Sequence, residues 1–110
     1  MNQFDIFSWQ PPDYPEPHPS IVISHPDRAS NKPWVELIVG STKRATRQAH
    51  PYEIILDQAD GLDWPTLCRC DMIWAAHRSD LKQRRGQVTD ERQAQLVRTI
   101  IAAHGWSAIL

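Results

Sequence analysis

The sequence has little net charge, no long apolar run and no leader pattern. Its formal net charge of −1 gives no broad positive field, so any contact with nucleic acid must be local. No apolar run reaches the ~20 residues that a membrane-spanning helix needs, so no membrane partner is expected. The N-terminus lacks the basic and then apolar pattern of a signal peptide. The length of 110 residues predicts one domain, residues 1–110, with a modest core.

Cysteine is also scarce, and both cysteines lie in one segment, residues 66–73. If this segment is a strand, Cys68, Cys70 and Met72 share one face and are predicted to point inward. A disulfide between two residues on the same strand face is strained, so reduced thiols and a cytoplasmic location are expected. A structural zinc site needs more ligands than this pair supplies, so neither a metal nor another cofactor is expected.

Arg69 and Asp71 alternate with these cysteines and therefore share the opposite face of the predicted strand. A cation held beside an anion on a rigid element suits phosphate chemistry, because a guanidinium matches phosphate oxygens with several donors. Spacing alone equally allows a weak surface ion pair. Both interpretations stay open on the motif by itself.

Strand-like and helix-like patterns together predict a mainly β protein. Five strands are predicted at residues 4–9, 21–23, 34–39, 52–56 and 66–73. The connections are a proline-rich loop at 10–19, a polar turn at 25–33, a basic loop at 41–51 and a helical turn within 78–85. This order favours a small antiparallel barrel with a helix packed on it.

The final helix is predicted from its N-cap and its apolar spacing. Asp90 is the expected N-cap, with Gln93 completing a capping box, and Gly105 is the expected terminator. The predicted apolar stripe consists of Leu96, Val97, Ile100 and Ile101.

Several short motifs follow one another along the chain before and after Arg69-Cys70-Asp71: Asp5-Ile6-Phe7, Ile21-Val22-Ile23-Ser24, Val39-Gly40-Ser41-Thr42, Gly61-Leu62 and Arg78-Ser79-Asp80-Leu81. In this order the motifs resemble the PemK/MazF family of toxin endoribonucleases, and the similarity covers most of the chain. Arg69-Cys70-Asp71 is most similar to the PemK/Kid branch of that family.

The resemblance implies an SH3-like barrel of the PemK/CcdB type, a homodimer and metal-independent cleavage of single-stranded RNA that inhibits growth. It also implies an antitoxin whose flexible acidic segment covers the RNA groove. Arg69 and Asp71 match the active-site pair of the PemK/Kid branch. The predicted RNA contacts are Ser41, Thr42, Lys43, Arg44, Arg47 and Thr66.

The sequence departs from the family pattern at His18, where MazF-like members carry a catalytic arginine. Intrinsic chemistry favours His18 and Asp71 for proton transfer and Arg69 for charge stabilisation, because a guanidinium does not lose its proton near neutral pH. Two alternatives follow from the departures. One is a non-catalytic CcdB-like barrel that acts by binding a protein such as gyrase, and the other is a degenerate, inactive toxin.

Overall fold

The computed structural model describes residues 1–41 and 47–110. The predictions for Thr42, Lys43 and Arg44 therefore lie outside the described residues. The strands of the described part are β1 (Asp5–Trp9), β2 (His18–Val22), β3 (Trp34–Val39), β4 (Glu53–Leu56), β5 (Thr66–Arg69), β6 (Trp74–His77) and β7 (Arg84–Gln87). The helices are α1 (Pro26–Asn31), α2 (Asp90–Ala103) and the 3₁₀ turns η1 (Gln58–Asp60), η2 (Arg78–Asp80) and η3 (Trp106–Ala108).

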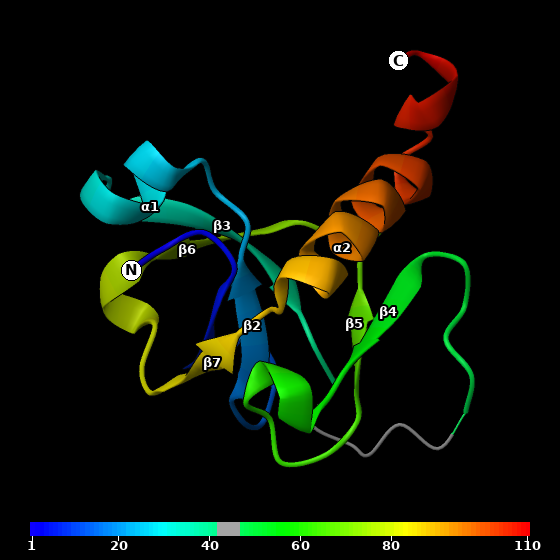
Figure 1. Ribbon diagram of the computed structural model, residues 1–110. Coiled ribbons are helices and arrows are strands. Elements are labelled where there is room, and N and C mark those ends of the chain that lie inside the picture. Colours follow the sequence, from blue (N-terminus) through cyan, green and yellow to red (C-terminus); the bar gives the residue numbers. More distant parts are fainter. Residues whose placement is uncertain (42–46) are drawn as a thin grey trace.

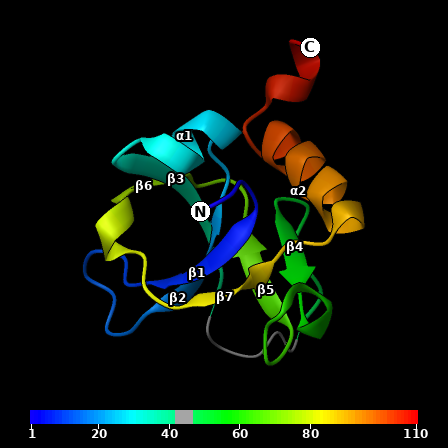
Figure 2. The same ribbon diagram turned by 60° about the vertical axis from the view of Figure 1, so that its left-hand side comes forward.

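The strands form two antiparallel sheets, a strongly curved larger sheet and a hairpin that lies beside it (Figures 1 and 2). The larger sheet has the order β6-β3-β2-β1-β7, and β4 and β5 form a separate hairpin. A single bridge between Gly40 and Cys68 joins the end of β3 to β5 within the described residues. The predicted class, a mainly β protein with a C-terminal helix, is confirmed.

The inner strands of the larger sheet, β1, β2 and β3, are mostly buried because they separate two core clusters. On β3, Ile38 packs into the cluster beneath β4, β5 and α2, whereas Leu37 and Val39 pack into the cluster beside α1. Successive side chains of a strand point to opposite faces, so a continuous apolar strand supplies both clusters. The path of β3 between them brings its end, at Gly40, to the junction of the two sheets.

Helix α2 covers β4 with a narrower stripe than the sequence predicts. Leu96 and Ile100 are buried, but Val97 is exposed and Ile101 is only half-buried. The helix runs beside the hairpin (Figure 1), and its residues in the core cluster are Leu96 and Ile100, with Ala103 packed against that cluster. Gly105 follows the helix with a φ of 73°, as expected for a terminator in the left-handed region.

The N-cap of α2 is Thr89, not Asp90. The Thr89 hydroxyl accepts a hydrogen bond from the amide of Arg92 at 3.4 Å. Gln93 donates from its side chain to the carbonyl of Val88 and forms no capping box. Asp90 instead occupies the first turn, where its charge favours the helix dipole.

Four predicted boundaries are wrong for local reasons. The strand predicted at 21–23 begins earlier, at His18, inside the segment predicted as a proline-rich loop. The turn at 25–33 contains α1, which is capped by the His25 ring and begins with a proline. The strand predicted over 66–73 ends at Arg69, and the chain turns before β6 starts at Trp74. The segment 78–85 forms η2 as predicted but then enters β7, which pairs with β1.

Candidate active site

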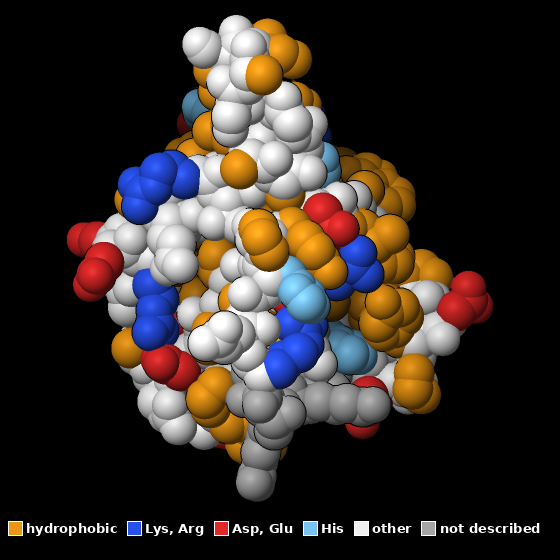
Figure 3. Space-filling view, turned by 90° about the vertical axis from the view of Figure 1, so that its right-hand side faces the viewer, with side chains coloured by type: hydrophobic (Ala, Val, Ile, Leu, Met, Phe, Trp, Pro, Cys, Tyr) orange, Lys and Arg blue, Asp and Glu red, His pale blue; other side chains and the backbone are white. Residues whose placement is uncertain are grey.

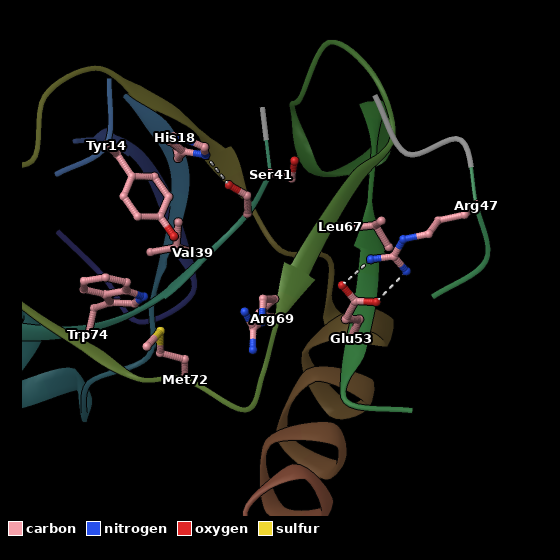
Figure 4. Close-up of a pocket in the computed structure, with 11 residues that line it drawn as sticks. Tyr14, His18, Val39, Ser41, Arg47, Glu53, Leu67, Arg69, Met72 and Trp74 are labelled. Carbon is pink, nitrogen blue, oxygen red and sulfur yellow. Dashed lines mark hydrogen bonds and ion pairs between the residues drawn. The ribbon is translucent and has the colours of Figure 1, made fainter. Parts of the chain in front are cut away.

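A pocket of about 440 Å³ opens where the two sheets meet. Its lining comes from distant parts of the chain: β2, β3, β4, β5, β6 and the proline-rich loop. The lining residues are Tyr14, His18, Val39, Gly40, Ser41, Arg47, Glu53, Leu67, Arg69, Met72 and Trp74 (Figure 4). Figure 3 looks onto the β4–β5 side of the molecule, where positive, histidine and hydrophobic side chains gather.

The structure pairs Arg69 with Asp71, as the alternation predicted. Arg69 donates from Nε to one carboxylate oxygen of Asp71 at 3.1 Å and from Nη2 to the other at 2.8 Å. These hydrogen bonds hold the pKa of Asp71 below its usual range. The guanidinium also lies 5.8 Å from the ring centre of Tyr52. A guanidinium has five donors, so Arg69 keeps donors that the carboxylate does not use.

His18 lies on the pocket wall and is oriented by the end of β3. Its Nδ1 is 2.9 Å from the carbonyl oxygen of Gly40. A carbonyl can only accept, so Nδ1 carries the proton in this contact and the neutral ring has its lone pair on Nε2. The ring also meets the Tyr14 ring edge-on, with 5.0 Å between the centres. His18 is thus held by two contacts that leave Nε2 as the basic atom.

Glu53 is a pocket residue that the sequence reasoning missed. Its carboxylate accepts two hydrogen bonds from Arg47, at 2.8 and 2.9 Å, and one from the amide of His50 at 3.0 Å. The Glu53 side chain is only 3% exposed. Its pKa is lowered, mainly by the hydrogen bonds from Arg47. The available signal was a charged residue inside an otherwise apolar strand.

Register places Glu53 beside the predicted pair, because Glu53 is directly opposite Arg69 in the β4–β5 hairpin. Directly opposed residues of two strands project from the same face. Arg47, predicted as an RNA contact, lies at the pocket, but both of its terminal nitrogens are bound to Glu53. Arg47, Glu53 and Arg69 therefore line the pocket together, whereas Asp71 reaches it only through its hydrogen bonds to Arg69.

Ser41 and Thr66, two of the predicted RNA contacts, have different surroundings. Ser41 lines the pocket, and its amide donates to the carbonyl of Leu67 at 2.7 Å. Thr66 is 1% exposed, does not line the pocket, and donates from its hydroxyl to the carbonyl of Trp64. Thr66 packs beneath Gly40, where a Cβ on the glycine would lie 2.8 Å from the threonine methyl. Its contact with RNA stays a prediction, and its burial gives that prediction no support.

The cysteines are buried and free, as predicted. Burial raises the pKa of the Cys70 thiol to about 12, with a smaller contribution from the negative charge of Asp71. The prediction for Met72 is wrong, because the strand ends before it. Met72 is 46% exposed and lines the pocket. Over residues 1–41 and 47–110, no group of three His, Cys, Asp or Glu side chains is placed to hold a metal ion.

Comparison with known proteins identifies the family that this pocket and fold define. The profile of the PemK-like, MazF-like toxins of type II toxin–antitoxin systems matches residues 2–104. The chain therefore belongs to this toxin family. The closer affinity to the PemK/Kid branch stays a prediction. A comparison with curated protein sequences gives no match.

Solved structures of toxins share the fold at low sequence identity. Mycobacterium tuberculosis toxin MazF-mt6 is 19% identical, with a TM-score of 0.78, over 92% of this chain and 96% of that one. A mycobacterial endoribonuclease in complex with its cognate antitoxin is 17% identical, with a TM-score of 0.81, over 96% and 95%. The MazE-MazF structure (Form-II) from Deinococcus radiodurans is 9% identical, with a TM-score of 0.73, over 96% and 95%.

The helices of the described residues are all too short or too polar to cross a membrane.

Proposed function

We propose that this toxin is an endoribonuclease that cleaves single-stranded RNA without a metal ion. The observation that carries the proposal is that His18 and Arg69 line one pocket, each held by a partner that leaves its reactive part unused. RNA supplies its own nucleophile, the 2′-hydroxyl, so the protein needs only a base, a charge stabiliser and a way to hold the phosphate.

In this mechanism Nε2 of His18 accepts the proton of the 2′-hydroxyl. The 2′-oxygen forms a bond to phosphorus, and the bond from phosphorus to the 5′-oxygen breaks. The products are a 2′,3′-cyclic phosphate and a 5′-hydroxyl, whose oxygen takes its proton from water. The hydroxide that remains takes the proton from His18 and restores the neutral ring. Arg69 stabilises the additional negative charge on the phosphorane with the donors that Asp71 does not occupy.

We assign Asp71 to positioning and not to proton transfer, which refines the sequence prediction. Both of its oxygens accept hydrogen bonds from Arg69, and its pKa is lowered by them. A weaker base with both oxygens engaged is poorly suited to remove the 2′ proton. Fixing the guanidinium is the contribution that this geometry supports.

The proposed partners are single-stranded RNA, a second copy of the chain and an antitoxin with a flexible acidic segment. An acidic segment would complement the guanidinium of Arg69, which is 58% exposed at the pocket. One similar solved structure is of a mycobacterial endoribonuclease in complex with its cognate antitoxin, and another is of MazE-MazF, which supports the antitoxin proposal. Cytoplasmic location remains a prediction from the reduced cysteines.

The test is to incubate the purified protein with an unstructured RNA in the presence of EDTA. We expect fragments with 5′-hydroxyl ends, lost in Arg69→Ala and retained in Arg98→Ala, which removes an exposed arginine of α2 outside the pocket. Intact RNA over a wide range of protein concentration, without antitoxin, would contradict the proposal.

A CcdB-like protein binder is the second candidate, and the exposed apolar C-terminal residues favour it. Ile109 is 81% exposed and Leu110 is 85% exposed. If RNA stays intact while the protein still arrests growth, and Ile109→Asp abolishes that arrest, this alternative replaces the nuclease.

A further inference from the structure

The pocket has a second wall that the proposed cleavage chemistry does not use. Tyr14, Met72 and Trp74 line it on the side that faces Arg69 (Figure 4). Tyr14 is 39% exposed and Met72 is 46% exposed. Aromatic and thioether groups left open inside a cleft, opposite a cation, favour a ligand with a flat apolar part and an anionic part.

The aromatic rings of this wall fix one another's orientation through edge-on contacts. Tyr14 meets Trp74 edge-on at 6.0 Å between ring centres, with an angle of 88°. Trp74 in turn meets the buried Trp9 at 5.7 Å and 70°. The same Tyr14 ring contacts His18 at 5.0 Å, so the wall is continuous with the proposed base. Because these side chains are already held in place, binding a ligand here would cost little side-chain conformational entropy.

The loop that carries Tyr14 is also constrained. The Gln10 side chain donates to the carbonyl of Tyr14 at 2.7 Å, and the Tyr14 amide donates to the carbonyl of Pro11 at 3.1 Å. Asp13 holds a φ of 67°, and prolines on both sides restrict the backbone further. Tyr14 is thus presented to the pocket by a preformed turn.

We propose that Tyr14, Met72 and Trp74 form a subsite that binds one unstacked nucleobase next to the phosphate held by Arg69. This inference rests on the proposed function and adds the part of the substrate that the second wall takes. A single nucleotide unit combines a flat ring with an anion, as the two walls require, and it fits a pocket of about 440 Å³. Stacking on an aromatic ring accepts every base, so the subsite contributes affinity more than sequence choice.

The test measures binding of a short single-stranded 2′-fluoro oligonucleotide, which lacks the nucleophile and cannot be cleaved. Fluorescence anisotropy gives the dissociation constant for the wild type and for Tyr14→Ala, Tyr14→Phe and Met72→Ala. We expect Tyr14→Ala to weaken binding about tenfold, because loss of one base–aromatic contact typically has an effect of that order. Tyr14→Phe keeps the ring and should bind like the wild type.

Removal of single bases from the oligonucleotide identifies the ligand. An abasic residue at one position should weaken binding to the wild type but cause no further loss in Tyr14→Ala. Trp34→Ala is the matched control, because Trp34 is a 53% exposed aromatic residue outside this pocket and should leave binding unchanged. If Tyr14→Ala does not fold, the binding of intact and abasic oligonucleotides is compared in Met72→Ala instead.

Failure of the subsite differs from failure of the nuclease. The subsite proposal would be overturned if Tyr14→Ala and Met72→Ala bind the oligonucleotide as tightly as the wild type. It would also be overturned if every abasic position weakens binding to Tyr14→Ala as much as it weakens binding to the wild type. Either result counts even if the protein cleaves RNA. Non-additive loss at one position, in a protein that cleaves no RNA, would support the subsite and reject the nuclease.

Discussion

The hydrogen bonds of Asp71 favour a positioning role, which we propose in place of the proton transfer expected from the sequence. The Arg69–Asp71 pair could be predicted because strand alternation relates residues two apart. The lowered pKa and the use of both carboxylate oxygens could not, because they depend on the turn that replaces the end of the strand. Glu53 escaped prediction because its importance comes from register with Arg69, a contact between distant segments.

Asp71→Asn separates positioning from proton transfer. The change removes the charge that holds Arg69, so we expect kcat/KM to fall by about a hundredfold, the loss that a small misplacement near the reacting atoms produces. The limb of the pH–rate profile that reports the proposed base should persist, because His18 still supplies it. Disappearance of that limb in Asp71→Asn, and its persistence in His18→Gln, would instead make Asp71 the base.

Glu53→Gln tests the buried carboxylate through stability. Because the folded-state pKa of Glu53 is lowered, its stabilising contribution is present above the unfolded value of ~4.3 and is lost as pH falls through the folded value. We expect Glu53→Gln to lower the free energy of unfolding by about 1–3 kcal/mol at pH 7. The difference from the wild type should shrink near pH 3, as measured by urea unfolding at both pH values. A difference independent of pH would contradict the ion-pair contribution.

At the scale of elements, the sequence predicts five of the seven described strands, misses β6 and β7, and places several strand ends incorrectly. Residues 4–9, 34–39 and 52–56 contain observed strands because local alternation or β-branched runs define them. β7 was missed because its sequence, Arg84 to Gln87, has no apolar alternation and is a strand only by pairing with β1. Helix α1 was missed because His25 caps it with a ring nitrogen, which is an uncommon cap.

The N-cap of α2 can be tested by comparing two adjacent residues. Thr89→Ala removes the hydroxyl that accepts from the Arg92 amide and should destabilise the protein by about 0.5–2 kcal/mol. Asp90→Ala removes only a favourable charge in the first turn of α2, so it should lower the free energy of unfolding by less than Thr89→Ala does. Thermal unfolding of both variants decides the order, and a larger loss in Asp90→Ala would restore the original sequence prediction.

Gly40 tests whether the junction of the sheets sets the geometry of the pocket. A Cβ on Gly40 would lie 2.8 Å from the Thr66 methyl and 3.2 Å from the carbonyl oxygen of Pro19. Gly40→Ala should therefore separate β3 from β5, shift the carbonyl that orients His18 and abolish RNA cleavage. Gly105→Ala is the control. Gly105 lies outside the pocket, has a positive φ, and an added Cβ would meet nothing within 4 Å. It should lower stability slightly and leave cleavage unchanged.

At the scale of the molecule, a buried ion network fastens the C-terminal helix to the rest of the fold. The carboxylate of Asp60 is fully buried and accepts hydrogen bonds from the Arg92 guanidinium and from the amides of Asp57 and Thr89. Breaking a buried pair leaves an uncompensated charge, which is costly. This network therefore stabilises the fold through residues that do not themselves line the pocket.

The bridge between Gly40 and Cys68 has a consequence for how the toxin can be switched off. In the described residues, this bridge and the Ser41 amide's bond to Leu67 are the backbone links beside the pocket, with His18 on one side and Arg69 on the other. A slight separation of the two sheets would move His18 away from Arg69 and abolish the proposed cleavage, while most of the secondary structure stays intact. Cleavage should therefore vanish at lower urea concentrations than the far-ultraviolet circular dichroism signal. An inhibitor that inserts between the two sheets would therefore abolish the proposed cleavage without contacting His18 or Arg69.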